Sequence, residues 1–369
     1  MKKGIVLICL NLLFVAFLFA QPGGKYILLE EFSTAPCGFC PDGDLIAADI
    51  IKKYPKVIWV THHAGFGTDS MTVPESVSIA TAFTTGAPMA PIDRGDYKIP
   101  VYTIAPYISV SRQKWDSVCV AHLNDVPVVD IGISNQYNSS TRMLNTTVYA
   151  NFKTVPAAGD IRINLYLMED SVVGIGKGYD QKNYFNANSG HPFYQKGDEI
   201  VGYVHHHVMR KIPGGAWGVS GIIPSTPVIN NNYSYTFSNI SIPNKWNVNK
   251  MDVIAFVSYH NTNAALRQVL NSNHKSLLDA TPAGVNAVAP LQEFISVYPN
   301  PASERIFVST GFEGKLELMN FAGQVLNTFN PDQNNNEGFS VAGLPNGVYF
   351  YRLINPDKSV GQGKLVIMH

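Results

Sequence analysis

The sequence predicts an α/β segment followed by two β-sandwiches, and three patterns support this fold class. Strand and helix patterns alternate from residue 25 to 122. Short strands of alternating apolar and polar residues, broken by Asn, Gly and Pro, fill residues 125–280. A further set of short strands with Gly and Asn at the turns fills residues 293–369. Residues 281–292 are rich in Ala, Pro and Val and predict a linker.

The composition fits a β-rich extracellular protein with more than one domain. The chain has 369 residues, which is too long for one ordinary hydrophobic core. Only 15% of the residues are charged, while Asn, Thr, Gly, Tyr and Val are plentiful. The 27 basic residues balance 27 acidic residues. This balance argues against nucleic acid as a partner and against docking to a membrane through a polybasic surface.

Residues 1–20 have the pattern of a secretion signal peptide. Lys2 and Lys3 form a basic end, Ile5 to Phe19 is an apolar core, and Ala20 is the expected last residue before cleavage. The alternative, a membrane anchor, is disfavoured because the apolar run is short for a membrane span. We therefore expect a secreted or cell-surface protein.

A pair of cysteines at C-x-x-C spacing, Cys37 and Cys40, follows the signal peptide. The apolar run 26–32 before it predicts a buried strand, and the helical period that begins after Pro41 predicts a helix. A thiol near a helix N-terminus is biased toward the reactive thiolate. An oxidising compartment favours a Cys37–Cys40 disulfide. The remaining mature cysteine, Cys119, is expected to be a buried small hydrophobic residue.

The elements after the first helix continue the alternation. Val57 to Thr61 is a second apolar, β-branched run, and Ser76 to Thr84 predicts a helix. Residues 86–94 follow as a third strand region, and Ile108 to His122 predicts a last helix. The order β-α-β-α-β-α indicates an α/β sandwich over residues 25–122.

The segment from Glu31 to Cys40 resembles the active-site segment of thioredoxins. Glu31 lies six positions ahead of the first cysteine, and Pro88 closes a Gly-x-Pro sequence that matches the cis-proline of that family. The sequence departs from the thioredoxin pattern at Pro36, where a Trp is usual, and in the Gly-Phe between the cysteines. The resemblance implies a thioredoxin-like fold for residues 25–122.

The same resemblance implies four site residues. Cys37 would attack a substrate disulfide and Cys40 would resolve the mixed disulfide. Glu31, buried below Cys40, would exchange a proton with it, because burial raises the pKa of a carboxyl group. Pro88 would lie across from Cys37 and present backbone to a substrate strand.

Two further resemblances concern export. Tyr298-Pro299-Asn300-Pro301, a Gly-Val-Tyr strand and the Gly-Lys-Leu-Val ending are similar to the C-terminal sorting domain of the type IX (Por) secretion system of Bacteroidetes. This implies a partner, the type IX secretion machinery, which acts through residues 293–369. Residues 25–280, with Gly202 to Arg210, resemble the Bacteroidetes outer-membrane family called Omp-twenty-eight-related.

Several histidines leave alternatives open. His62 and His63 follow the second strand and either stabilise a thiolate or bind a metal, or are simply solvated or hydrogen-bonded. His205 and His207 would share one face of a strand, but a structural role is favoured over a metal site. Arg210 is expected to anchor a turn or a carboxylate. We expect no metal and no cofactor.

The sequence supports two functional hypotheses. The first is thiol–disulfide exchange in the cell envelope or at the surface, on protein disulfide or thiol substrates. The second is a non-enzymatic surface protein that binds a partner through its β-sandwich and keeps Cys37–Cys40 as a structural disulfide.

Overall fold

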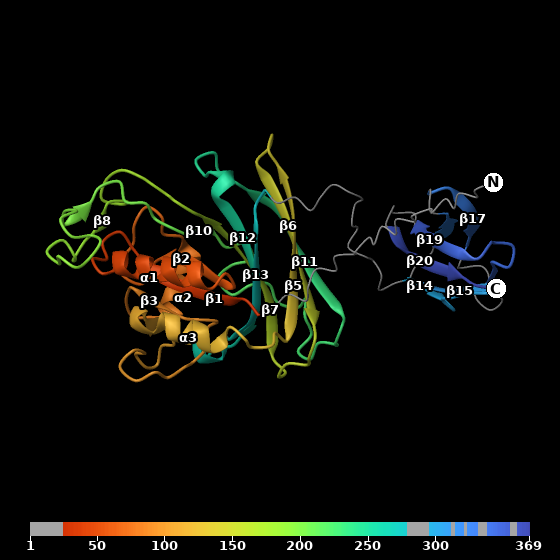
Figure 1. The fold of residues 1–369 in the computed structure, drawn as a ribbon, viewed down its shortest axis with the longest axis horizontal. Helices are drawn as coiled ribbons and strands as arrows, with labels where there is room; N and C mark the ends of the chain where they lie inside the picture. The colour runs from red at the N-terminus through yellow and green to blue at the C-terminus, as the bar shows by residue number, and fades with distance from the viewer. Residues whose placement is uncertain (1–24, 279–294, 311–313, 321–322, 331–337, 355–359) are drawn as a thin grey trace, which may run out of the picture. The chain divides into compact units, whose positions relative to one another are not determined.

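The computed structural model describes residues 25–278, 295–310, 314–320, 323–330, 338–354 and 360–369. The chain divides into two compact units, the first ending at Thr281 and the second beginning at Pro282 (Figure 1). The predicted signal peptide and the predicted linker, 281–292, lie outside the described residues. Among the described residues, no helix is both long and apolar enough to cross a bilayer.

The first unit is built on one eight-stranded sheet with the order β13-β12-β7-β10-β2-β1-β3-β4. β2 pairs in parallel with both β1 and β10, and the other pairs are antiparallel. The strands are β1 (Ile27–Ser33), β2 (Val57–His63), β3 (Met89–Ala90), β4 (Val110–Ser111), β7 (Asp160–Glu169), β10 (Val208–Lys211), β12 (Met251–His260) and β13 (Val269–Ser276).

Three helices form in the regions where the sequence predicts them: α1 (Cys40–Lys53), α2 (Pro74–Phe83) and α3 (Trp115–His122). The last helix is shorter than the predicted range of Ile108 to His122, because Val110–Ser111 pairs with β3 as strand β4. Proline in the first turn of α1 and of α2 has a fixed backbone angle that suits a helix start. In α1, Asp42 lies in the first turn and Lys52 and Lys53 in the last, which complements the helix dipole. Short 3-10 helices span Arg112–Lys114, Val248–Lys250 and Ala264–Leu266.

Strand β1 is buried on both faces, and its alternate residues enter two different cores. Leu29 packs with side chains of α1 and α3. Leu28 packs on the other face with α2, β7 and β12. The same alternation directs Glu31 toward α1 and Glu30 toward β7.

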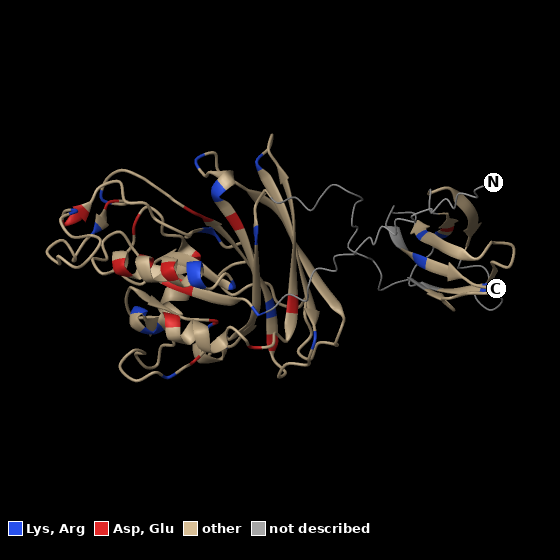
Figure 2. Ribbon diagram, in the orientation of Figure 1, with Lys and Arg blue, Asp and Glu red and all other residues tan. Residues whose placement is uncertain are grey.

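A second sheet, with the order β11-β6-β5, packs on the half of the large sheet that contains β7 and β12. Its strands are β5 (Val129–Asn138), β6 (Met143–Phe152) and β11 (Asn232–Ser241). Apolar side chains from both sheets form one core. Basic and acidic residues are interspersed along the chain and do not segregate by sign (Figure 2). The β-sandwich predicted for this region is therefore present.

The boundary predicted between residues 122 and 125 does not interrupt the large sheet. Val208 of β10 pairs with Thr61 of β2 on one side and with Glu169 of β7 on the other. The strand thus joins the α/β segment to the sandwich by backbone hydrogen bonds. The two segments predicted as separate domains share one compact unit.

A buried ionic network reinforces this junction. Arg94 donates two hydrogen bonds to the Glu30 carboxylate, at 2.8 and 2.9 Å. Tyr166 of β7 donates to Glu30 at 2.8 Å and accepts from Arg94 at 2.6 Å. Burial works to raise the pKa of Glu30, but the Arg94 charge and its hydrogen bonds outweigh it and hold that pKa well below the usual range. Glu30 is therefore ionised inside the protein.

The second unit is a small β-sandwich, as predicted. One sheet has the order β14-β15-β18 and the other β17-β16-β19-β20, with a shared apolar core. The strands are β14 (Ile295–Tyr298), β15 (Arg305–Thr310), β16 (Lys315–Met319), β17 (Val325–Phe329), β18 (Phe339–Ser340), β19 (Gly347–Ile354) and β20 (Val360–Ile367).

Replacing Arg94 should be strongly destabilising. Arg94→Ala leaves the Glu30 carboxylate buried and without its cation, which costs about 3–5 kcal/mol of unfolding free energy. Urea unfolding followed by tryptophan fluorescence measures this loss. Lys53→Ala is the control, because its ion pair with Asp49 is exposed to solvent and contributes little to stability. Equal losses in the two variants would contradict the prediction.

Candidate functional site

The structure contains the predicted Cys37–Cys40 disulfide. Cys37 lies in the turn that follows β1, and Cys40 is the first residue of α1. The backbone N–H of Cys37 donates to the Thr34 carbonyl at 3.0 Å, and that of Cys40 donates to the Cys37 carbonyl at 3.2 Å. Cys37 is only 3% exposed and Cys40 is fully buried. The disulfide is therefore shielded from solvent.

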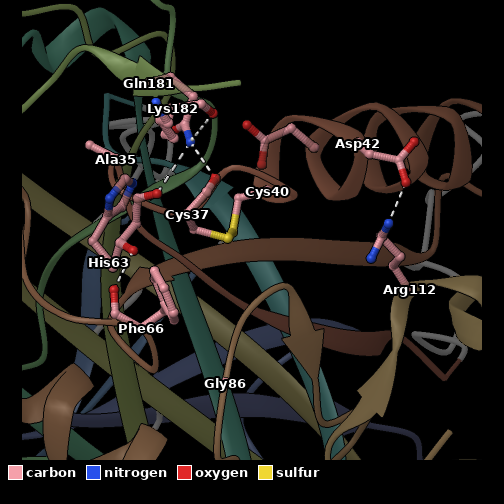
Figure 3. The surroundings of a disulfide bond; sticks show 12 residues. Ala35, Cys37, Cys40, Asp42, His63, Phe66, Gly86, Arg112, Gln181 and Lys182 are labelled. Carbon is pink, nitrogen blue, oxygen red and sulfur yellow. Dashed lines mark hydrogen bonds and ion pairs between the residues drawn. A yellow bond between two sulfur atoms is a disulfide. The ribbon is translucent and has the colours of Figure 1, made fainter. Parts of the chain in front are cut away.

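The shield comes from the long connection between β7 and β10, residues 170–207. This connection contains a two-stranded ribbon, β8 (Gln181–Lys182) with β9 (Glu199–Ile200). We call residues 181–184 the cover segment. Figure 3 shows Gln181 and Lys182 lying over Cys37.

Four hydrogen bonds tie the cover segment to carbonyl groups of the turn at residues 34–39, which we call the cysteine turn; the longest, from the Gln181 side-chain amide to the Thr34 carbonyl, is 3.3 Å. The Gln181 side-chain amide donates to the Cys37 carbonyl at 2.8 Å. The backbone N–H of Lys182 donates to the Ala35 carbonyl at 2.8 Å, and that of Tyr184 donates to the Gly38 carbonyl at 3.0 Å. The cover segment therefore satisfies polar groups of the turn that a solvent-exposed site would leave to water.

The residue pair between the cysteines fits this cover. A Cβ atom at Gly38 would lie 2.4 Å from the Tyr184 ring, so only glycine leaves room for it. Phe39 contacts the same ring edge-on, with centroids 5.0 Å apart. The Gly-Phe that departs from the thioredoxin pattern is thus complementary to Tyr184.

A second contact holds the connection to α1. Asp42 pairs with Arg112 on one oxygen and with His191 of the connection, at 3.2 Å, on the other. The Arg112 guanidinium also lies 5.6 Å from the centre of the Phe39 ring. Figure 3 shows Asp42 and Arg112 on the side of α1 away from Gln181.

Glu31 is fully buried, and both its carboxyl group and Pro88 lie against Gly43 of α1. Its Oε2 accepts a hydrogen bond from Trp59 at 2.8 Å, whereas Oε1 has no hydrogen-bond partner. A Cβ at Gly43 would lie 2.5 Å from Oε1 and 2.9 Å from Pro88, so the carboxyl group faces the first turn of α1. Burial raises the pKa of Glu31, and the nearby Asp44 charge raises it further. The Ala87–Pro88 peptide bond is cis.

Asp44 is a site residue that the sequence reasoning missed. It follows Cys40 by four positions in α1, so the two side chains lie on the same face of the helix, one turn apart. Its Oδ2 accepts a hydrogen bond from the Tyr203 hydroxyl at 2.6 Å, and its Oδ1 has no partner. Burial raises the pKa of Asp44 to about 6. The C-x-x-x-D spacing was visible in the sequence, but the burial was not.

His63 braces the cysteine turn, while His62 lies on the opposite face of β2. His63 Nδ1 lies 2.6 Å from Asp69, whose carboxylate also accepts from the Ala35 N–H at 2.8 Å. Although burial works to raise it, the pKa of Asp69 is lowered by its hydrogen bond with His63. His62 lies 3.4 Å from Glu30.

The three consecutive histidines do not lie on a strand as expected, because they precede β10. His205 packs edge-on to His63, with ring centroids 5.2 Å apart, and burial lowers its pKa to about 4. His206 pairs with Asp170 at 3.0 Å, and the His207 ring lies 4.5 Å from that of Trp59. Within the described residues, no group of His, Cys, Asp and Glu is arranged to hold a metal.

Arg210, by contrast, pairs with a carboxylate as predicted, that of Glu169 at 3.1 Å. Cys119 is fully buried, as expected for a small hydrophobic residue.

A cleft of about 600 Å³ adjoins the cysteine turn. Phe39 and Pro88 line it on the side of the disulfide, and Val101 and Ile104 line it with exposed apolar side chains. Arg112 supplies a positive charge. The cleft suits a polypeptide segment with an apolar side chain.

The two units together define a modular protein of the cell surface. Residues 78–277 match the family model described as outer membrane protein Omp28, and residues 296–368 match the model of a secretion system C-terminal sorting domain. The chain belongs to the Omp28 family. It is a secreted, outer-membrane-associated protein exported by the type IX system, whose machinery acts on the sorting domain.

Two solved structures are similar to the chain, and the first of them supports the fold. HBP35 of Porphyromonas gingivalis is 16% identical, with a TM-score of 0.54 over 94% of this chain and 99% of that one. A domain of the outer membrane lipoprotein Omp28 from the same organism is also 16% identical, with a TM-score of 0.24 over 42% of this chain and 90% of that one. No curated protein matches the chain in sequence.

Stability should respond to pH through Asp44. Its folded pKa of about 6 exceeds the unfolded value of about 3.9, so stability from this group falls as pH rises from 4 through 6. Asp44→Asn removes the free-energy cost of ionising a carboxyl group at this buried position. We expect equal unfolding free energies at pH 4 and a variant more stable by about 1–3 kcal/mol at pH 8.

Urea unfolding at the two pH values checks this. Asp49→Asn, on the exposed face of the same helix, is the matched control and should show no such gain. A variant that is destabilised equally at pH 4 and pH 8 would disprove the assignment.

Proposed function

We propose that the first unit carries out thiol–disulfide exchange at the cell surface, with Cys37 as nucleophile and Cys40 as resolving cysteine. The observation that carries this proposal is the disulfide at the start of α1, with the buried Glu31 and Pro88 both lying against Gly43 of that helix. A thioredoxin-like fold for residues 25–122 belongs to the proposal. Parallel β1 and β2, antiparallel β3, and helices on both faces of β1 support it.

The exchange balances as follows. In the dithiol form, the Cys37 thiolate attacks one sulfur of a substrate disulfide, and the other sulfur leaves as a thiolate. The Cys40 thiol gives its proton to Glu31 in its carboxylate form, and the resulting Cys40 thiolate attacks the Cys37 sulfur, which releases the second substrate thiolate. The substrate gains two electrons and takes two protons from water, and the protein is left as the observed disulfide. The reverse sequence oxidises a substrate dithiol.

The cleft beside Phe39 and Pro88 supports a polypeptide substrate. Its exposed apolar residues, Val101 and Ile104, provide a surface for an apolar side chain next to the reactive sulfur.

The cover segment makes this exchange conditional. An attacking sulfur must approach along the disulfide axis, and Cys37 is 3% exposed. The bonds from Gln181, Lys182 and Tyr184 must therefore open before a substrate reaches it. This supports a gated exchange with selected partners rather than a general reductase.

The same burial favours the second candidate function, a surface binding protein in which Cys37–Cys40 is structural. The reduction potential separates the two. Equilibration of the mature protein with glutathione should give a value between about −270 and −120 mV for a working exchange protein. A value below about −300 mV would mark a structural disulfide and overturn the first proposal.

Activity provides an independent test of the nucleophile. Cys37→Ser should abolish reduction of a protein disulfide by the pre-reduced protein, because no thiolate remains to attack. Cys119→Ala, which removes the buried thiol outside the site, should retain the activity. Equal activity of Cys37→Ser and the unmodified protein would refute the role of Cys37.

Loosening the cover should expose the disulfide. The double variant Gln181→Ala and Tyr184→Ala loses a side-chain hydrogen bond and a ring contact, each contributing about 1 kcal/mol. The rate of reduction by dithiothreitol should rise at least about threefold. Tyr194→Ala, in the same connection but bonded only to His191 and Gln195, is the control. An unchanged rate in the double variant would show that the cover does not limit access.

A further inference from the structure

Two carboxyl groups from different elements lie at the start of α1, the helix whose first residue is the resolving cysteine. Glu31 comes from β1 and Asp44 from α1, and they are 0% and 7% exposed. Each has one oxygen in a hydrogen bond, from Trp59 and from Tyr203, at 2.8 and 2.6 Å. The other oxygen of each, Glu31 Oε1 and Asp44 Oδ1, is buried and has no hydrogen-bond partner.

Both groups lie close to Cys40. Asp44 is one helical turn beyond Cys40 on the same face of α1. Glu31 Oε1 occupies the space that a side chain at Gly43, in that turn, would fill. The missing side chain at Gly43 is therefore what lets the β1 carboxyl group approach the helix.

Two carboxylates in one buried site do not both ionise near neutral pH, because like charges repel and burial penalises each charge. The hydrogen bonds distinguish them. The Tyr203 hydroxyl donates to Asp44 and so favours its ionised form. The remaining proton then belongs to Glu31, on the oxygen that faces α1.

The surrounding charges agree with this assignment. His63 of β2 and His206 of the β7–β10 connection both favour the ionised form of Asp44. Arg112 and the Trp59 N–H favour ionised Glu31, but burial and the Asp44 charge outweigh them and raise its pKa.

We propose that Asp44 is a positioning residue for proton transfer: it shares one proton with Glu31, and Tyr203 directs that proton to Glu31, which exchanges it with Cys40. This inference rests on the proposed exchange function. When an external thiolate attacks Cys37, the S–S bond breaks and its electron pair goes to the Cys40 sulfur, which takes the proton from Glu31. In the reverse direction the Glu31 carboxylate removes it. Asp44 sets the pH at which Glu31 changes from donor to acceptor.

Tyr203 belongs to the same β7–β10 connection as the cover segment. The β7–β10 connection therefore supplies both the cover over Cys37 and the Tyr203 hydroxyl that donates a hydrogen bond to Asp44. Neither contact is made by the side chain of Cys37 or Cys40, so each can be altered by substitution while the disulfide stays intact.

The test is the pH dependence of disulfide reduction in the full mature chain. Reduction by dithiothreitol is followed from pH 4 to pH 9, and the rate is divided by the thiolate concentration. The unmodified protein should lose normalised rate above the pH at which Glu31 ionises. Asp44→Asn should move that inflection down by about one pH unit or more, because the repelling charge is gone. Tyr203→Phe should also move it, because Asp44 then ionises less readily.

Glu31→Gln should remove the inflection, and the Glu31→Gln, Asp44→Asn double variant should behave like Glu31→Gln alone. Asp49→Asn, which removes an exposed charge from the same helix, is the control. A purely structural role would change the rate by the same factor at every pH. An inflection that stays in place in Asp44→Asn would overturn the inference.

Failure of the exchange function itself would look different. Dithiothreitol reports the chemistry of the disulfide without a protein substrate. If the inflection moves in Asp44→Asn while no protein disulfide is reduced, the carboxyl pair stands and the exchange function fails. If protein disulfides are reduced and the inflection does not move, the exchange stands and the pair fails.

Discussion

The bonds among Glu30, Arg94 and Tyr166 are the constraint on which the first unit depends. They connect β1 and the segment that follows β3, both in the α/β segment, to β7, which belongs to the sandwich. A buried carboxylate is costly without its cation, so these elements cannot separate without exposing or stranding a charge. Aromatic rings enclose the Arg94 guanidinium and exclude water from it: Phe83, Trp217 and Phe256.

The same strand carries two neighbouring glutamates with opposite electrostatics. Glu30 meets a cation and has a lowered pKa, whereas Glu31 meets another acid in a buried site and has a raised one. The alternation of β1 sends one side chain to each face, and the network on the Glu30 face fixes the direction of the other. A structural carboxylate with a lowered pKa and a candidate acid with a raised pKa thus stand next to each other in the sequence.

The candidate site combines a disulfide-bonded cysteine pair with burial of both cysteines. The cysteine turn, α1 and Pro88 form the chemical part, and the β7–β10 connection closes over it. In the proposed exchange, a cover that opens only to a fitting partner would limit reaction with other thiols and disulfides at the cell surface. The cleft beside Phe39 stays open, which leaves a place for such a partner to bind first.

The sequence by itself determined the elements and the local motifs. Strand and helix periods, the C-x-x-C pair and the order of the C-terminal motifs are short-range patterns, and α1, β2 and the second sandwich follow from them. Only the tertiary structure decided the continuity of the large sheet, the cover over Cys37, and the pairing of Asp44 with Tyr203. Those two residues are 159 positions apart. No local period encodes a contact of that range, because it depends on how separate elements pack and which of them exclude water.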